Sequence, residues 1–328
     1  MTDHSVSNHW TGRRDVAEGE RGRRWHEVVT RGGDIQPAEV VLLGFACDAG
    51  VRRNGGRVGA ADGPAAIRSM LANMPAWEGL RLRDAGDVLC DGDALEDAQE
   101  RLSDEIARAL AASGFPIALG GGHEIAFASF RGLCKSLLSA SEPQRVGIVN
   151  LDAHFDLRAD SVPSSGTPFL QAARWCAEKG WPFNYACYGA SLFANTRSLF
   201  RRASELGVDV MLDEDMVLGR EPSIAERLRR FAAKVDHLYL TIDLDTLPAA
   251  VAPGVSAPAA RGTDPRLIEL AIDTLAATGK LRLADLGEMN PRFDVDSRTA
   301  RTAARFVARL AARKSASSDL FENVGDQP

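Results

Sequence analysis

The sequence predicts an α/β protein in three layers, with a parallel central sheet of about eight strands between two layers of helices. Short runs that are apolar at successive positions alternate with longer segments of helical periodicity. Strands that are apolar on both sides must be buried on both faces, as in a parallel sheet covered by crossover helices. We see no internal repeat and no linker rich in proline, glycine or serine, which indicates one α/β domain.

The individual elements follow from local patterns. In the segment 93–113, apolar residues recur at helical spacing from Leu95 through Leu102 to Leu110, which predicts an amphipathic helix. The predicted strands are bounded by polar or glycine-containing segments. They are VVLLGF (40–45), PIALG (116–120), VGIVNLD (146–152), YACYGA (185–190), VDVML (208–212), HLYLTIDLD (237–245) and LRLADLGE (281–288).

The two ends of the chain differ from its middle. Residues 1–37 are polar, rich in arginine, glutamate and glycine, and lack either hydrophobic period, so we expect a partly mobile surface arm. Residues 38–314 form the expected catalytic domain, and 315–328 a polar tail. No apolar signal core or membrane span is evident, and the five cysteines form no CxxC pair. We therefore expect a cytoplasmic protein.

The charge of the chain points to a small-molecule partner. Its 328 residues carry a formal net charge of -6, and the sequence pI is near 5.6. Such a chain offers no electrostatic footprint for nucleic acid or for an anionic membrane surface. We expect neither as a partner.

Acids and histidines gather where three predicted strands end. In NLDAHFDLR, alternation of side chains along an extended segment would point Asp152, His154 and Asp156 the same way. TIDLD repeats this spacing with Asp243 and Asp245, and His123 follows a glycine turn in GGGHE. Ligands of parallel α/β folds bind beyond the carboxyl ends of the strands, so we expect these six side chains to share one site.

The donor types indicate a hard or borderline metal. Four carboxylates in one crevice repel one another and take up protons unless cations compensate them, and two divalent ions cancel their formal charge. Oxygen and imidazole donors without cysteine suit Mn²⁺ better than a thiolate-bound zinc. Two ions about 3.5–4 Å apart can hold a hydroxide as nucleophile. Each DxH or DxD alone is more often structural, and GGGHE lacks the GK[ST] ending of a P-loop, but the combination favours metal.

The histidines argue against a serine or cysteine hydrolase. Three of them lie in the expected arm, and His237 opens a strand, where a structural role is expected. Only His123 and His154 remain near the predicted site, and both are candidate metal ligands. A Ser-His-Asp or Cys-His mechanism needs a further imidazole, so metal-activated water is the better nucleophile.

At these residues the sequence resembles the ureohydrolase family of arginases, agmatinases and formimidoylglutamases, through GGGHE, NLDAHFD, TIDLD and GEMNP in this order. The likeness spans Val40 to Arg305 and implies the arginase fold, a site for two Mn²⁺ ions per subunit and a homo-oligomer. It also implies bridging roles for Asp152 and Asp243, and a role for Glu288 in holding the cationic end of a substrate. By the same resemblance His123 and Asp156 bind one ion, and His154 and Asp245 bind the other.

Within the family, GVRRNGGRVGAADGPAAIR (50–68), ANTRSLF (194–200) and DTLPAAVAPGVSAPAARG (245–262) resemble formimidoylglutamases. Ser165 stands where arginases and agmatinases carry a histidine, and Arg158 where arginases have an asparagine near the substrate's carboxylate. Arginine binds carboxylates in bidentate fashion, which favours a substrate with carboxylates over agmatine. Arg57, with Arg52 and Arg53, is a candidate for a second carboxylate or equally a surface residue, and Asn195 and Ser165 are further candidate contacts.

The resemblance implies hydrolysis of N-formimino-L-glutamate to L-glutamate and formamide, a step of histidine breakdown. Glu288 and Asp245 are the predicted catalytic residues, with Asp245 donating a proton to the leaving amine. Two alternatives remain at this point. One is a ureohydrolase acting on agmatine or a guanidino acid, and the other is a non-catalytic metal-binding protein of the same fold.

Overall fold

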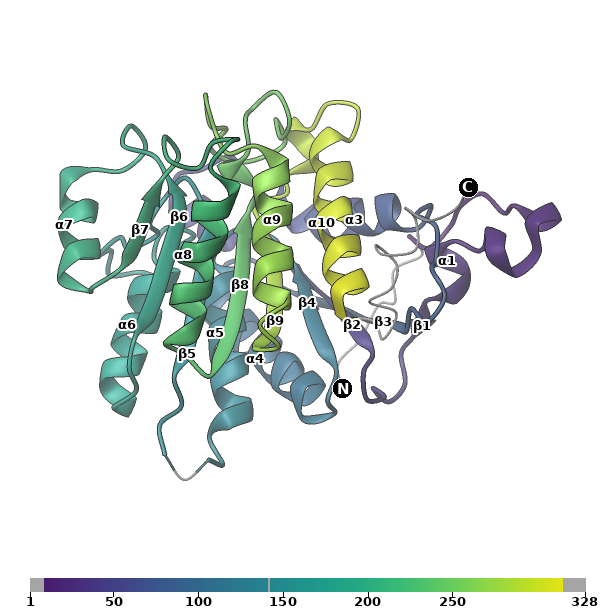
Figure 1. Ribbon diagram of the computed structural model, residues 1–328, viewed down its shortest axis with the longest axis horizontal. Helices are drawn as coiled ribbons and strands as arrows, with labels where there is room; N and C mark the ends of the chain where they lie inside the picture. Colours follow the sequence, from purple (N-terminus) through teal and green to yellow (C-terminus); the bar gives the residue numbers. More distant parts are fainter. Residues whose placement is uncertain (1–8, 141, 315–328) are drawn as a thin grey trace.

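The protein is built around one sheet of parallel strands, as the sequence predicts (Figure 1). The computed structural model describes residues 9–140 and 142–314. Among them the sheet has nine strands, in the order β1-β3-β2-β4-β9-β8-β5-β6-β7. The strands are β1 (Thr30–Arg31), β2 (Val40–Ala46), β3 (Leu82–Leu89), β4 (Phe115–Leu119), β5 (Val146–Leu151), β6 (Asn184–Ala190), β7 (Asp209–Leu212), β8 (His237–Asp243) and β9 (Leu281–Gly287).

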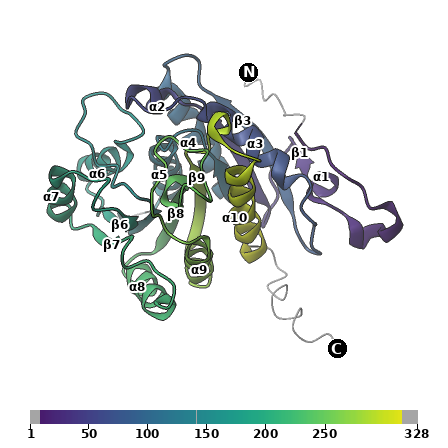
Figure 2. The same ribbon diagram turned by 90° about the horizontal axis from the view of Figure 1, so that it is seen from above.

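Helices cover both faces of the sheet, which confirms the predicted three layers (Figures 1 and 2). One apolar core lies under α3, α8, α9 and α10, and the other under α4, α5, α6 and α7. The α-helices are α1 (Trp25–Val28), α2 (Ala49–Arg53), α3 (Gly63–Leu71), α4 (Leu95–Ala111), α5 (Ile125–Leu137), α6 (Pro168–Lys179), α7 (Arg197–Glu205), α8 (Glu221–Ala233), α9 (Pro265–Ala276) and α10 (Arg298–Lys314), and the 3₁₀ helices are η1 (Val16–Gly22), η2 (Ala60–Asp62), η3 (Leu244–Thr246) and η4 (Pro291–Phe293).

The strands read as continuous apolar runs because they contribute to both cores. In β2, Val40 and Leu42 pack in the core under α3 and α10, whereas Val41 and Leu43 pack in the core under α4 and α5. Side chains alternate between the faces of a strand, so a strand buried on both sides needs apolar residues at every position.

The sequence analysis did not predict two of the strands, β1 and β3. β1 has two residues, lies in the expected arm and makes the count nine rather than about eight. β3 is interrupted by polar residues: Asp84 pairs in register with Leu42, but Asp87 pairs with Gly44, so β3 carries one extra residue there. This β-bulge and the charges around it break the apolar run that identifies the other strands.

The described part of the predicted arm is packed against the domain. Trp10 and Trp25 are buried in the core under α3 and α10, and β1 pairs with β3. These contacts hold residues 10–31 along one edge of the sheet (Figure 2). Residues 1–8 of the arm and the predicted tail 315–328 lie outside the described residues.

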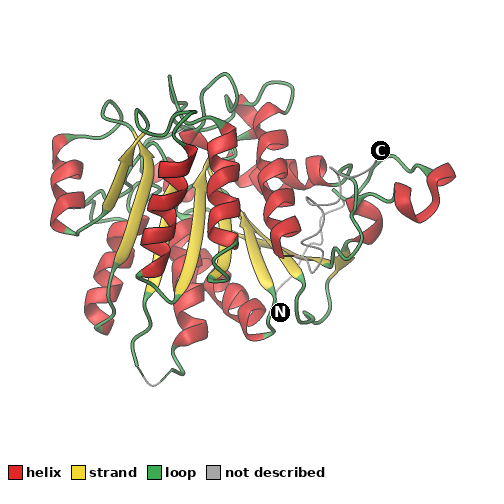
Figure 3. Cartoon of the chain, in the orientation of Figure 1, coloured by secondary structure: helices red, strands yellow, loops and turns green. Residues whose placement is uncertain are grey.

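The loops that follow the strands gather at one edge of the sheet, at the top of Figure 3. Because all strand pairs are parallel, every carboxyl end lies on this side. Of the helices described in residues 9–140 and 142–314, none has both the length and the apolar character needed to cross a membrane.

Candidate metal centre

Four neighbouring strands in the middle of the sheet deliver the predicted ligands to one place. The strands lie in the order β4, β9, β8 and β5. His123 comes shortly after β4, Glu288 directly after β9, and Asp152 directly after β5, while Asp243 is the last residue of β8. The clustering that we predicted from strand ends is therefore a consequence of strand order.

The glycine turn before His123 is needed for close approach of neighbouring backbones. A Cβ atom at Gly121 would lie 2.0 Å from the carbonyl oxygen of Cys47, and one at Gly120 would lie 2.3 Å from that of Leu286. Larger residues would push the turn away from β2 and β9. The turn also meets the last strand directly, because the Glu288 amide donates a hydrogen bond to the Gly121 carbonyl at 2.8 Å.

One group of possible ligands surrounds Nδ1 of His123. This nitrogen lies 2.8 Å from a carboxylate oxygen of Asp156, 3.1 Å from one of Asp243 and 3.2 Å from one of Asp152. All four donor atoms lie within 4.8 Å of one another. Such a set can hold one divalent cation.

A second group lies beside the first and shares Asp152 with it. His154 Nδ1 lies 3.1 Å from Asp245 Oδ2 and 3.5 Å from Asp152 Oδ1. Asp152, His154 and Asp245 also form a set whose ligand atoms fall within 4.8 Å. The two groups can thus hold two cations joined through Asp152.

The ligands of the β5 loop converge in a way that differs from the alternation we expected. β5 ends at Leu151, and Asp156 has a φ of +48°, so the segment turns instead of continuing as a strand. The backbone amide of His154 donates to Asp152 Oδ1 at 2.7 Å, which stabilises the turn. Asp156 and His154 consequently belong to different ligand groups.

Burial and mutual repulsion raise the pKa values of several carboxyl groups of the centre. Burial, followed by the charge of Asp152, raises the pKa of Asp156 to about 6. Burial, followed by the charge of Asp243, raises the pKa values of Asp245 and Glu288 well above their ordinary range. A cation at the centre would lower these pKa values, because it favours the ionised carboxylates.

The two histidines respond to the same excess of negative charge. Asp245 raises the pKa of His154 well above its ordinary value, although burial opposes the rise. Burial would lower the pKa of His123, but Asp243, together with hydrogen bonds to Asp152 and Asp156, raises it well above the ordinary value. Burial would raise the pKa of Asp152, yet hydrogen bonds with both histidines lower it. The centre therefore attracts positive charge.

Two buried carboxylate oxygens of the site lack partners within the described part of the chain: that of Asp245, a candidate ligand, fits a metal ion, and that of Glu288 fits a cationic substrate group. Asp245 Oδ1 and Glu288 Oε2 are buried and have no hydrogen-bond partner among the described residues. The other Glu288 oxygen accepts the His123 amide at 2.9 Å. Buried carboxylate oxygens normally have partners, so these two call for a ligand that the protein itself does not provide.

A cavity of about 330 Å³ opens onto both ligand groups. Its volume is in the range of small-molecule sites. All four predicted substrate contacts line it, and the structure adds Asn54 and Ser256, which the sequence analysis missed. The predicted contacts are Arg57, Arg158, Ser165 and Asn195.

Arg158 and Ser165 lie next to each other in this cavity. The Arg158 amide donates to the Gly166 carbonyl at 2.8 Å, and a Cβ at Gly166 would lie 2.6 Å from Arg158 Cδ. Arg158 is exposed, and its guanidinium forms no ion pair with any residue described in the structure. Ser165 is buried, and its hydroxyl accepts a hydrogen bond from Asn54 Nδ2 at 3.1 Å. Asn54 belongs to the NGG stretch of the family motif, and this motif is the sequence signal that could have identified it.

Arg57 and Asn195 reach the cavity wall with most of their polar groups already engaged. Arg57 donates to the carbonyls of Val255 and Ser256 and lies 4.1 Å from the ring centroid of Phe293. Asn195 Oδ1 accepts from the Phe155 amide, and its Nδ2 donates to two backbone carbonyls. Their contacts indicate that they hold the loops around the site.

Arg52 and Arg53 form ion pairs with residues outside the cavity. Arg52 pairs with Asp48 at 3.1 Å. Arg53 pairs with Asp93 at 3.0 Å and with Glu96 at 2.7 Å. Neither is among the residues that line the cavity.

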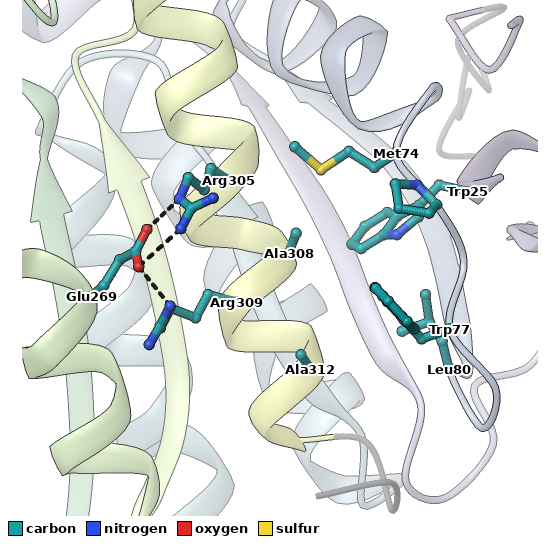
Figure 4. A pocket seen from close by; sticks show the side chains of 10 residues that line it. Trp25, Met74, Trp77, Leu80, Glu269, Arg305, Ala308, Arg309 and Ala312 are labelled. Atoms are coloured by element: carbon teal, nitrogen blue, oxygen red, sulfur yellow. Dashed lines mark hydrogen bonds and ion pairs between the residues drawn. The ribbon is translucent and has the colours of Figure 1, made fainter. Parts of the chain in front are cut away.

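A second hollow of about 300 Å³ lies between α10 and the segment that precedes β3 (Figure 4). Trp25, Trp77 and Leu80 form one side of it, and α10 forms the other. Its acid, Glu269, pairs with Arg305 and Arg309. This hollow offers no set of metal ligands among the residues described and lies apart from the strand-end site.

Fold and site together define a class of protein, an α/β protein with a candidate centre for two metal ions at the carboxyl edge of a parallel sheet. The model of the Arginase family matches residues 38–312 of the chain. The chain therefore belongs to the arginase family, as the motifs predicted.

The relatives narrow the comparison. A formimidoylglutamase of Ralstonia nicotianae is 58% identical over 304 residues, covering 92% of this chain and 94% of the relative. That of Aeromonas hydrophila is 53% identical, covering 92% and 96%. Among solved structures, a Trypanosoma cruzi formiminoglutamase with Mn²⁺ is 26% identical, with a TM-score of 0.74 and coverage of 84% of this chain and 93% of that one.

Proposed function

We propose that the chain hydrolyses N-formimino-L-glutamate to L-glutamate and formamide with two Mn²⁺ ions. The observation that carries the proposal is an exposed arginine, Arg158, lining the same cavity as two groups of metal ligands. The likeness to proteins named formimidoylglutamase, at 58% and 53% identity over most of the chain, supports it. N-formimino-L-glutamate matches these groups because it joins an amidine to two carboxylates.

The six predicted ligands would hold the two ions. His123, Asp156 and Asp243 would contribute to the first site, His154 and Asp245 to the second, and Asp152 to both; the family resemblance adds Asp243 as a second bridge. Bound there, the two ions would lower the pKa of a water molecule and so make it available as the nucleophile. Nitrogen and carboxylate donors without thiolate suit Mn²⁺, which also occurs in the similar Trypanosoma cruzi structure.

Glu288 would bind the amidinium end of the substrate. Its Oε1 is fixed by the His123 amide, whereas the buried Oε2 lacks a partner and Glu288 lines the cavity. A carboxylate accepts charge-assisted hydrogen bonds from an amidinium in a defined plane. Glu288 would thereby orient the amidine carbon toward the two ligand groups.

Asp245 is the proposed proton donor. The C–N bond between the formimino carbon and the glutamate nitrogen breaks, water supplies the carbonyl oxygen of formamide, and the amine must gain a proton. Asp245 Oδ2 lies beside His154, while Oδ1 is buried without a partner among the described residues and Asp245 lines the cavity. It therefore has an oxygen available to carry that proton to the leaving nitrogen.

Arg158 would bind one carboxylate of the substrate. The Ser165 hydroxyl and the Asn54 side-chain amide would bind the other end of the substrate. Arg57 and Asn195 would support these contacts by holding loops, since their polar groups bind backbone. Ser165 also means that no histidine is available at that position as a proton shuttle. Both features favour formiminoglutamate over agmatine, which has no carboxylate.

Product analysis tests the proposal directly. Purified, Mn²⁺-loaded protein is offered formiminoglutamate, agmatine and 4-guanidinobutyrate separately, with Asp152→Ala as the inactive control. We expect formamide and glutamate from the first substrate alone. Urea from a guanidino compound would establish the ureohydrolase alternative, and bound metal without turnover of any amidine would establish a non-catalytic protein.

Arg158→Met tests the carboxylate contact. We expect KM for formiminoglutamate to rise about 10–100-fold, because one charge-assisted hydrogen-bonding group contributes roughly 1.5–3 kcal/mol. kcat should change less, since the reacting centre is untouched. The matched control is Arg201→Met, which removes an arginine of α7 whose side chain is 74% exposed. An unchanged KM in Arg158→Met would remove Arg158 from the substrate site.

We also propose that the enzyme works in the cytoplasm as a homo-oligomer. The cytoplasmic location is supported by the five cysteines, all of which are free. The homo-oligomer rests on family resemblance.

A further inference from the structure

A chain of polar side chains lies beneath His123, on the side of its ring away from the carboxylates. It consists of Thr241 and Tyr239 on β8 and Asp285 on β9, and the exposed fraction of each is 0%. The helix α5 covers them and contributes Ser129, which is equally buried. Burying polar groups costs free energy unless they hydrogen-bond to one another, so the presence of these four side chains in the core calls for an explanation.

Strand register brings the members of the chain together. Thr241 of β8 pairs directly with Asp285 of β9, so their side chains lie next to each other on the same face. Tyr239 lies two residues before Thr241 and therefore on that face too, and its hydroxyl donates to Asp285 Oδ2. Burial raises the pKa of Tyr239 well above its ordinary value.

This chain of polar side chains begins at Nε2, the second ring nitrogen of His123. Nδ1 faces Asp152, Asp156 and Asp243, whereas Nε2 lies 2.9 Å from Thr241 Oγ1. A metal ion at Nδ1 requires that nitrogen to be unprotonated, which places the ring proton on Nε2. Nε2–H must then donate to Thr241, and the Thr241 hydroxyl must donate its own proton elsewhere.

Asp285 provides the next acceptor. Its Oδ1 is buried and has no hydrogen-bond partner among the residues described, while Oδ2 already accepts from Tyr239. Its neighbour in register on β8 is Thr241, whose hydroxyl is therefore next to the carboxyl group. Asp285 Oδ1 is thus the group that needs the proton offered by Thr241.

We propose that Thr241 and Asp285 are positioning residues, which hold His123 in the tautomer and orientation that bind the first metal ion through Nδ1. With a metal ion at Nδ1, His123 Nε2–H would donate to Thr241 Oγ1, and the Thr241 hydroxyl would donate to Oδ1 of its register neighbour Asp285. Hydrogen-bond partners of this kind, on the far nitrogen of a metal-binding histidine, orient the ring and raise its basicity. The inference rests on the proposed metal function and extends it beyond the six ligands.

The second histidine provides an internal comparison. His154 belongs to the other ligand group, which shares Asp152 with the first. Its Nδ1 faces Asp152 and Asp245, and its side chain is 27% exposed, whereas that of His123 is 1% exposed. Removing the polar side chains beneath His123 should therefore weaken metal binding at one site and leave binding at the other site unchanged.

The test is a Mn²⁺ titration of metal-free, full-length protein by calorimetry, with the two binding steps resolved. Thr241→Val keeps the branched shape and removes the hydroxyl, and Asp285→Asn keeps the shape and removes the carboxylate. We expect each variant to lose about 10–100-fold in affinity at one of the two sites. Thr241→Ser is the matched control and should bind both ions as the wild-type chain does.

The outcomes separate this inference from the proposed function. Wild-type protein that fails to bind two Mn²⁺ ions overturns the proposed metal function, whatever the variants do. Wild-type protein that binds two ions, with unchanged isotherms or an equal loss at both sites in the variants, overturns the positioning role alone. Thermal unfolding of the metal-free variants checks their fold, and if Thr241→Val does not fold, Asp285→Asn decides the question by the same criteria.

Discussion

Two clusters of buried charge lie in this molecule, and they differ in what compensates them. In the candidate metal centre, four aspartates meet two histidines at the ends of β4, β5 and β8. In the second cluster, Arg68 of α3 is 0% exposed and lies 2.8 Å from Asp84 and 2.5 Å from Asp87 of β3. Among the described residues, no lysine or arginine forms an ion pair with the aspartates of the first cluster, whereas the second cluster is built around an arginine.

The oxygens of the two clusters show the same contrast. Both oxygens of Asp84 have donors, because Oδ1 accepts from Arg68 and from the Gly86 amide, and Oδ2 accepts from Trp10. In the metal centre Asp245 Oδ1 lacks a partner among the described residues. Buried charge that the chain itself compensates is structural, and buried charge that it leaves uncompensated indicates a ligand.

The largest expected effect comes from removing the aspartate that both ligand groups share. Asp152→Ala should lower kcat/KM by more than about 1,000-fold, because residues that merely support metal ligands are already worth 10–100-fold. The variant should also lose the rise in melting temperature that Mn²⁺ gives the wild-type protein, since a ligand stabilises only the state that binds it. Steady-state kinetics and thermal unfolding with and without Mn²⁺ measure both effects.

The matched control for this prediction is Asp160→Ala, which removes an exposed aspartate from the same loop. It should leave activity and the Mn²⁺ effect unchanged. An Asp152→Ala protein that keeps full Mn²⁺-induced stabilisation would show that the ions bind elsewhere, and the contrast between the two clusters would fail.

The Arg68 cluster should respond in stability. Arg68→Met leaves Asp84 and Asp87 without their cation, and breaking a buried pair in this way costs about 3–5 kcal/mol. Urea denaturation measures the loss, while kcat per folded molecule should stay unchanged. Arg145→Met, which breaks an ion pair with Asp236 in which both side chains are exposed, is the control and should leave the midpoint unchanged. Equal effects of the two substitutions would contradict a structural role for the buried arginine.

The same contrast explains how far sequence reasoning reached. The predicted strands at β2, β4 and β9 were recognisable because apolar residues occupy both faces, and the three layers followed from them. β3 was not, because Arg83, Asp84 and Asp87 interrupt it. Asp84 and Asp87 are compensated by Arg68 of α3, and Arg83 by Glu39. Such pairings between separate segments cannot be read from either segment alone.

The candidate site, like the fold, was only partly predictable from the sequence. Strand ends and motif spacing located His123, Asp152 and the other ligands, because the residues of each motif are close in sequence. The family resemblance already implied that Asp152 is shared by two groups, but the turn that separates His154 from Asp156 was not predicted, and the Asn54 to Ser165 contact joins residues far apart in the chain. Such contacts depend on tertiary packing. The catalytic and substrate-binding roles remain predictions that the kinetic experiments test.

The smallest expected effect concerns Trp10, which lies in the segment that the sequence analysis treats as a surface arm. Its indole donates to Asp84 Oδ2 at 2.6 Å, and its exposed fraction is 5%. Trp10→Phe keeps an aromatic ring and removes the donor, so the free energy of unfolding should fall by about 1.5 kcal/mol, as for a hydrogen bond to a charged group. Trp77→Phe, at a tryptophan that is 53% exposed, is the control for ring size. Denaturation curves in which both substitutions cost the same would mean that ring volume, and not the bond to Asp84, holds the arm; a loss confined to Trp10→Phe would make the arm part of the charge-compensated cluster.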